Sequence, residues 1–148
     1  MKKNIFFLIA ISAITFVSCN DNCNDLDAPA SPSLFLDIID EVTEENVFVD
    51  SIYLDTQVLV QDFEENDVPF NVVFDSRLMH IVLEKKIMVD DTIYIKLNNP
   101  ETMQKDSIKL FYSTERFDEE CYTQYKTNSV TFPDNENELA NGIYKVKI

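Results

Sequence analysis

From Ser33 to the end of the chain, apolar and polar residues alternate with a period close to two. In an extended strand, successive side chains point to opposite faces, so this alternation indicates strands with one buried side. The pattern is clearest where Ile93, Ile95 and Leu97 alternate with Tyr94 and Lys96. The sequence therefore predicts an all-β fold.

Clusters of Asn, Asp, Glu and Pro separate the apolar runs, and turn signals at such short intervals are typical of a sandwich or a barrel. No window carries a helical stripe with caps. We expect about seven to nine short strands in one domain, residues 33–148. The expected strands are Leu34–Ile39, Val47–Leu54, Gln57–Gln61, Phe70–Phe74, Met79–Glu84, Asp91–Asn98, Ser107–Ser113, Cys121–Phe132 and Ile143–Ile148.

The chain has a single glycine, Gly142. Most turns must therefore use Asn and Asp, which tolerate left-handed backbone better than other residues with a Cβ. Clusters such as Asp90-Asp91 and Asn98-Asn99-Pro100 are expected to end strands, and Asn141-Gly142 predicts a hairpin.

The first 18 residues have the build of a secretory signal peptide. Lys2 and Lys3 precede an apolar run over 5–17, which is shorter than the roughly 20 residues that a membrane-spanning helix needs. The run ends in Phe16-Val17-Ser18-Cys19, which resembles the lipobox of bacterial lipoproteins. The resemblance implies that Cys19 becomes the acylated N-terminus; an ordinary signal peptide with a chance cysteine is the alternative.

Residues 19–32 are polar, acidic and interrupted by prolines, as in a tether. Acids this close to a lipidated cysteine resemble the surface-export signal of Bacteroidota-type lipoproteins, although a solvated acidic linker is the other interpretation. We expect an outer-membrane, lipid-anchored protein of the cell envelope, with its orientation left open.

The net charge excludes some partners. The formal charge is −15, and removal of residues 1–18 leaves ten basic against 27 acidic side chains, or −17. Such a field repels nucleic acid and anionic head groups, so only acyl chains would hold the domain on a membrane.

Two cysteines remain beside Cys19, namely Cys23 and Cys121. In an exported protein, an even number of cysteines besides the acylated one favours a disulfide between them, although two unpaired thiols are the alternative.

The sequence offers little for catalysis. The only histidine, His80, lies within an expected strand among apolar neighbours, where a satisfied or half-exposed histidine is a simpler interpretation than a catalytic base. Zinc sites of the usual Cys/His kind lack ligands. We expect no catalytic residues, no metal site and no cofactor.

Acidic clusters at 21–27, 118–120 and 134–138 could supply paired carboxyl groups for glycoside hydrolysis or oxygen ligands for calcium. Neither spacing signature is present, so solvated loops are the preferred interpretation.

Aromatic residues gather in the last third of the chain. They could form a sugar-binding or protein-binding platform on a sandwich face, or pack in the core, which is the more ordinary explanation. The residues are Phe111, Tyr112, Phe117, Tyr122, Tyr125 and Phe132.

Several features occur in one order: the lipobox cysteine, Cys23 four residues later, a proline-punctuated tether, and the run 106–112 followed by Phe117 and Cys121. This order resembles a group of small Bacteroidota-type lipoproteins of uncharacterised function. The resemblance implies an immunoglobulin-like antiparallel sandwich with a Cys23–Cys121 disulfide, and it transfers no active site.

The sequence thus favours a non-catalytic binding or interaction module, presented by a lipid anchor to an envelope protein or a glycan. A purely structural envelope component is the alternative, and a carboxylate-based glycan hydrolase is less favoured because no nucleophile, base and orienting group share a recognisable spacing.

Overall fold

The computed structural model describes residues 29–49, 52–119 and 121–148. This part of the chain contains nine strands and one short 3₁₀ helix. They are β1 (Ser33–Ile39), η2 (Asp55–Gln57), β2 (Val58–Asp62), β3 (Phe70–Val72), β4 (Met79–Val82), β5 (Met88–Asn98), β6 (Lys105–Asp118), β7 (Thr123–Thr131), β8 (Asn137–Ala140) and β9 (Ile143–Lys147).

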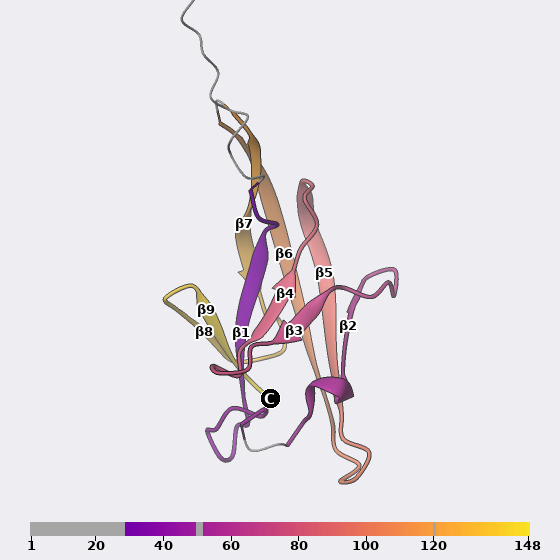
Figure 1. The fold of residues 1–148 in the computed structure, drawn as a ribbon. Coiled ribbons are helices and arrows are strands. Elements are labelled where there is room, and N and C mark those ends of the chain that lie inside the picture. Colours follow the sequence, from indigo (N-terminus) through magenta and orange to yellow (C-terminus); the bar gives the residue numbers. More distant parts are fainter. Residues whose placement is uncertain (1–28, 50–51, 120) are drawn as a thin grey trace, which may run out of the picture.

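The strands form two sheets (Figure 1). Sheet A has five strands in the order β3-β4-β1-β9-β8, and sheet B has four in the order β2-β5-β6-β7. The predicted all-β sandwich is confirmed; its immunoglobulin-like form stays a prediction. Strands β5 and β6 contain 11 and 14 residues and extend beyond the expected ranges 91–98 and 107–113.

One hydrophobic core fills the space between the sheets. On β1, Leu34, Leu36 and Ile38 point inward, and on β5 Ile93 and Ile95 do the same. Because the inward positions alternate with outward ones, each sheet contributes one apolar face. The other buried apolar residues of this core are Val47, Phe48, Tyr53, Val60, Met79, Ile81, Leu83, Leu97, Ile108, Leu110, Tyr112, Phe132 and Val146.

Strand β1 lies in the middle of sheet A. It pairs antiparallel with β4 and parallel with β9, where Phe35 is in register with Ile143. The other ladders are antiparallel. The first and the last strand of the sandwich are therefore direct neighbours.

The predicted hairpin at Asn141-Gly142 is confirmed. Both residues have positive φ, 53° and 80°, as a type I′ turn requires, and they connect β8 to β9. The other non-glycine residues with positive φ include two glutamates, an arginine and a methionine, so Asn and Asp do not supply all the left-handed positions.

The expected strand end at Asp90-Asp91 was wrong. Asp90 has a φ of 51° inside β5, and the register with β6 shifts between Met88 and Asp91. The left-handed residue thus forms an irregularity within a continuous strand, because β6 offers pairing partners on both sides of it.

The expected strand at Val47–Leu54 was also wrong, for its described residues. Asn46 bridges to Ile39, its side chain accepts a hydrogen bond from the Phe48 amide at 2.8 Å, and the chain then turns. Val47 and Phe48 are both buried. Two consecutive apolar residues can both be buried here because the segment closes one end of the core.

Strand β8 was missed. All four of its residues are exposed, and hydrogen bonds to β9 hold it in place. An edge strand without a buried face shows no alternation of apolar and polar residues. The only sequence signal for β8 is therefore the Asn141-Gly142 turn that follows it.

Candidate ligand-binding face on sheet B

The outer surface of sheet B carries a set of side chains in cross-strand rows. Lys96 of β5 is opposite Leu59 of β2 and Ser107 of β6. In the next row Tyr94 is opposite Gln61 and Lys109, and in the one after it Phe111 lies between Thr92 and Thr131. We call these nine residues the sheet B face; it carries two rings, two lysines and no carboxylate.

The two rings flank one lysine. The Lys109 ammonium lies 4.8 Å from the centroid of the Phe111 ring and 5.9 Å from that of Tyr94. These are cation–π distances. The contacts hold Lys109 between two half-buried rings and set the positions of all three side chains on adjacent strands.

A depression of about 840 Å³ lies at the Lys96 end of the sheet B face; Leu59, Lys96 and Ser107 line it, and the two rings lie in the rows that follow. It is bordered by the 3₁₀ helix η2 and by the ends of β2, β5 and β6. Its volume falls within the ~300–1,000 Å³ that ligand pockets commonly have. Its lining residues are Thr56, Gln57, Val58, Leu59, Lys96, Leu97, Asn98, Pro100, Lys105, Asp106 and Ser107.

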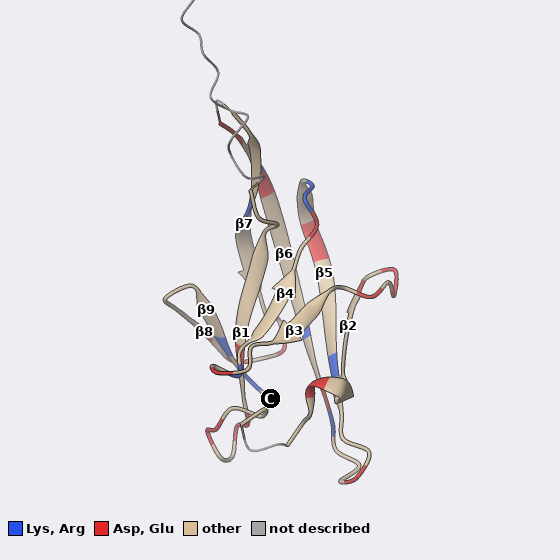
Figure 2. Cartoon of the chain, in the orientation of Figure 1, with Lys and Arg blue, Asp and Glu red and all other residues tan. Residues whose placement is uncertain are grey.

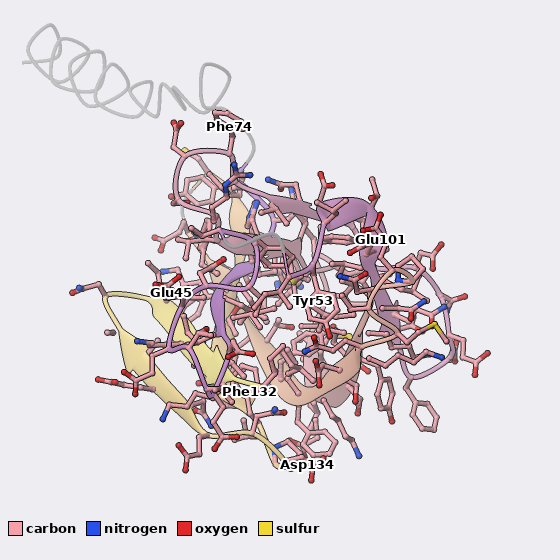
Figure 3. The ribbon with its side chains drawn as sticks, turned by 90° about the horizontal axis from the view of Figure 1, so that it is seen from below. Glu45, Tyr53, Phe74, Glu101, Phe132 and Asp134 are labelled. Carbon is pink, nitrogen blue, oxygen red and sulfur yellow. The ribbon has the colours of Figure 1, made fainter. Side chains whose placement is uncertain are left out.

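The one carboxylate of the depression already has two donors. Asp106 Oδ2 accepts a 2.5 Å hydrogen bond from the Tyr53 hydroxyl and a 3.1 Å bond from Gln104 Nε2. Figure 3 shows Tyr53 in the interior of this end of the sandwich, with Phe74 and Glu101 at its periphery. Burial first, and then the bond to Asp106, raise the pKa of Tyr53 above its ordinary value of 10.0, so the hydroxyl stays protonated and donates.

A buried asparagine fixes the turn beside the depression. Asn99 Nδ2 donates to the Ile52 carbonyl at 2.7 Å, and its Oδ1 accepts from the amides of Glu101 and Thr102 at 3.0 and 3.2 Å. The β5–β6 turn is thereby held against the segment that leads into η2.

Charge is distributed unevenly over the molecule (Figure 2). Basic residues lie on the lower halves of β5 and β6, and others lie on β7, on β9 and at the β4–β5 tip, whereas many acidic residues lie in loops. Three other basic side chains of the described residues form ion pairs, namely Lys86 with Glu84, Arg116 with Asp118, and Lys147 with Glu136, whereas Arg77 and Lys126 contact rings and Lys85 donates to a backbone carbonyl.

Lys96 and Lys109 of the sheet B face, and Lys105 in the row next to it, are not among the ion-paired lysines. Lys96 Nζ donates to Gln61 Oε1 at 3.0 Å, Lys109 contacts rings, and Lys105 forms no ion pair with any described residue. Three cations thus lie close together without a carboxylate as an ion-pair partner.

The predicted aromatic cluster is divided. Tyr112 and Phe132 are in the core, whereas Phe111 is on the sheet B face. Phe117 and Tyr122 are exposed near the far end of the β6–β7 pair. Core packing accounts for Tyr112 and Phe132, and a binding platform stays a prediction for the rings at the surface.

Sequence reasoning did not select Tyr94, Lys96 and Lys109 as site residues. The signal that could have found Tyr94 and Lys96 was present, because both are on the polar side of the clearest alternation in the chain. Their pairing with Lys109 depends on the β5–β6 register, which the sequence does not specify.

His80 is a half-exposed residue of β4, one of the two alternatives that we expected. Its ring stacks on Phe35 with centroids 4.6 Å apart and planes at 9°. Its Nδ1 lies 3.2 Å from the side-chain oxygen of Asn71 on β3. These contacts give the imidazole a structural environment on the outer surface of sheet A.

The predicted lipidation site Cys19 and the predicted disulfide partner Cys23 lie outside the described residues. Cys121 lies in the β6–β7 connection, two residues before β7 begins. The lipidation and the disulfide therefore stay predictions.

The acidic clusters do not converge in the described part of the chain. Three carboxyl groups there have a lowered pKa, because hydrogen bonds favour their charged form. For Asp62 the donors are Asn66 and Glu64, for Asp118 they are Thr123 and Arg116, and Asp40 accepts from amides of the following turn. A glycosidase acid needs the opposite shift.

No group of three or more His, Cys, Asp or Glu residues within 29–49, 52–119 and 121–148 has the arrangement of a metal site. In the same ranges no helix has the length and apolar character needed to cross a membrane. Comparisons with protein-family models, with curated proteins and with solved structures found no match.

We predict that Tyr53→Phe lowers the free energy of unfolding by about 1.5–3 kcal/mol at pH 7, because a hydrogen bond to a charged group is lost. The pKa of Tyr53 is raised on folding, so its contribution is fully present below pH 10.0 and is lost as pH rises through the folded pKa. The variant should therefore lose less stability than the parent above pH 10.0.

Urea unfolding followed by far-UV circular dichroism at pH 7 and at high pH measures both effects. Tyr122→Phe is the matched control, since that side chain is exposed and its change should stay within about 0.5 kcal/mol. Equal destabilisation by the two substitutions would contradict the proposed Tyr53–Asp106 interaction.

Proposed function

We propose that the chain is a non-catalytic binding module of the cell envelope, presented by a lipid anchor at Cys19, whose binding surface is the sheet B face. The observation that carries the proposal is the pair of rings, Tyr94 and Phe111, held on either side of Lys109 next to the depression. Rings on a sandwich face provide flat apolar surface for stacking, and neighbouring polar groups supply hydrogen bonds.

The charge pattern favours this proposal over a purely structural envelope component. A protein without a ligand would be expected to carry a more uniformly acidic surface, given its net charge of −15. Instead, lysines and aromatic rings gather on one side of one sheet. A side-chain arrangement of this kind provides a reason for specific binding.

The anchor is the second part of the proposal. Acyl chains on Cys19, each CH₂ contributing about 0.8 kcal/mol when buried, would hold the domain at the outer membrane without a protein span. The described chain enters β1 at one end of the sandwich, and the β5–β6 turn lies at the other (Figure 1). The depression next to that turn would therefore lie away from the membrane.

The chemistry of the proposed ligand is that of a glycan or of an envelope protein. We place this chain, as part of the same proposal, with the small Bacteroidota-type lipoproteins that its lipobox and cysteine spacing resemble. The Cys23–Cys121 disulfide also belongs to the proposal, since it would fasten the tether to the β6–β7 connection.

We predict that Tyr94→Ala combined with Phe111→Ala weakens ligand binding by at least about tenfold, because truncating an aromatic anchor commonly costs 1–2 kcal/mol. Binding is measured by affinity electrophoresis against a panel of neutral and acidic soluble polysaccharides, and by pull-down of solubilised envelope fractions.

Phe74→Ala is the matched control, since its ring is 79% exposed in the β3–β4 loop and lines neither the sheet B face nor the depression. Thermal melting shows whether the double variant is folded. If a folded double variant keeps all the binding of the parent, the sheet B face is not the binding surface.

We predict that Cys19 incorporates lipid. Cells grown with a labelled fatty acid should yield labelled protein from the parent sequence and unlabelled, uncleaved protein from Cys19→Ala. Cys23→Ala is the matched control and should keep the label. Label that persists in Cys19→Ala would contradict the anchor.

We predict that Cys23 and Cys121 form a disulfide, which in the chain-entropy model stabilises a loop of this length by about 4–5 kcal/mol. Peptide mapping by mass spectrometry without reduction should recover the two cysteines in one linked peptide pair. Recovery of both as alkylated single peptides would exclude the bond.

A further inference from the structure

We infer that the ligand of the sheet B face is an acidic polysaccharide whose sugar units carry carboxylate groups, such as a polyuronate. This inference rests on the proposed function, since it specifies the ligand of the same surface. It follows from three features of that surface: its charge, its shape and its chemical composition.

The first feature is a group of cations without counterions. Lys96, Lys105 and Lys109 form no ion pair among the described residues, although the protein has 27 acidic and only 12 basic side chains. Like charges placed close together repel, and a bound anion removes that repulsion. Asp106 forms no ion pair with these lysines, and the donors to its Oδ2 oxygen are Tyr53 and Gln104.

The position of Asp106 follows from the strand parity. It has the inward parity of Ile108 and Leu110 on β6, whereas Lys105, Ser107 and Lys109 have the outward parity. Asp106, the only carboxylate that lines the depression, therefore forms its hydrogen bonds on the core side of β6. The lysines project from the opposite, outer side, where the ligand would bind.

The second feature is an open and extended shape. Lys105 is in register with Asn98, and the three rows of the sheet B face follow along the same two strands. Alternate residues of a strand repeat every ~6.7 Å, so four rows extend over roughly 20 Å. A surface of this length, with a depression at one end, suits a chain of several sugar units better than a single small molecule.

The third feature is the lack of an apolar centre. The rings are half-buried between polar neighbours, and Leu59 is the one strongly exposed large apolar residue of the sheet B face. Of the other members, Gln61, Ser107 and Thr131 carry hydroxyl or amide groups at the surface, and Thr92 is buried. Protein interfaces usually have an apolar, charge-depleted core, whereas sugars combine ring stacking with many hydrogen bonds.

Beyond the row of Phe111, the surface of sheet B is no longer free of carboxylates. Glu115 of β6 is opposite Lys126 of β7, and Ser113 Oγ contacts Ser129 Oγ at 2.6 Å. The acid-free surface is therefore limited to the rows between Lys105 and Phe111, which defines where the carboxylates of the ligand would lie.

The experiment uses the full-length protein in detergent micelles. The probes are polygalacturonate, alginate and hyaluronate, each compared with the same polymer after its carboxyl groups have been reduced to alcohols, and polyglutamate. We expect affinity electrophoresis to show binding to at least one acidic polymer, with loss of binding after reduction and weakening at high salt.

We expect the double charge reversal Lys96→Glu with Lys105→Glu to weaken this binding by at least about tenfold, since both attraction and complementarity are lost. Lys145→Glu on β9, an exposed lysine of sheet A, is the matched control and should bind like the parent. Both lysine changes are at the surface, and thermal melting confirms that the variants are folded.

Each outcome of these experiments bears on a specific part of the inference. Equal binding to the reduced polymers, still lost in the Tyr94→Ala, Phe111→Ala double variant, would overturn the acidic ligand and leave the proposed binding face intact. Tighter binding to polyglutamate than to any polyuronate would assign an acidic protein partner instead. No binding to any acidic polymer would overturn the inference, and the ring variants would then test the binding face separately against neutral glycans and envelope fractions.

Discussion

Everything in this fold depends on the packing of one apolar face of sheet A against one apolar face of sheet B. Leu36 and Ile38 from the centre of one sheet and Ile95 and Leu110 from the centre of the other are completely buried. Burial of such side chains contributes about 1.5–3 kcal/mol each, which makes this contact the main favourable term. Because both sheets use every second residue for this purpose, the remaining residues are left for the two outer surfaces.

Those outer surfaces differ, and the difference supports the proposed role. Sheet A presents the stacked Phe35 and His80, with His80 Nδ1 next to the side-chain oxygen of Asn71. Sheet B presents lysines whose partners are rings and an amide. An incomplete set of electrostatic partners on one face, in a strongly acidic protein, is the property that a ligand of opposite charge would complete.

The sequence predicted the fold class well because alternation is a local signal. Ile93 to Leu97 reads as a half-buried strand without knowledge of any other segment, and so does Tyr144 to Ile148. The segment around Val47 was predicted wrongly as a strand, because its consecutive buried residues do not alternate. Strand β8 was missed, because none of its residues is buried. In both cases tertiary position, and not local pattern, decides the backbone.

The candidate site was predictable only in part, for the same reason. The outward parity of Tyr94 and Lys96 could be read from the chain, but their neighbours could not. Register between β5 and β6 brings Lys109 opposite Tyr94, and the contact of Tyr53 with Asp106 joins residues 53 positions apart. Such long-range relations set the chemistry of the surface.

The parallel pairing of β1 with β9 has a consequence for how the protein is made. Sheet A has its first-synthesised strand at the centre, and that strand keeps one open side until the last residues of the chain arrive. Contacts between such distant segments close late and slow folding. Before β9 is available, β1 can pair only with β4, so sheet A cannot complete its central ladders until residues 143–147 have left the ribosome.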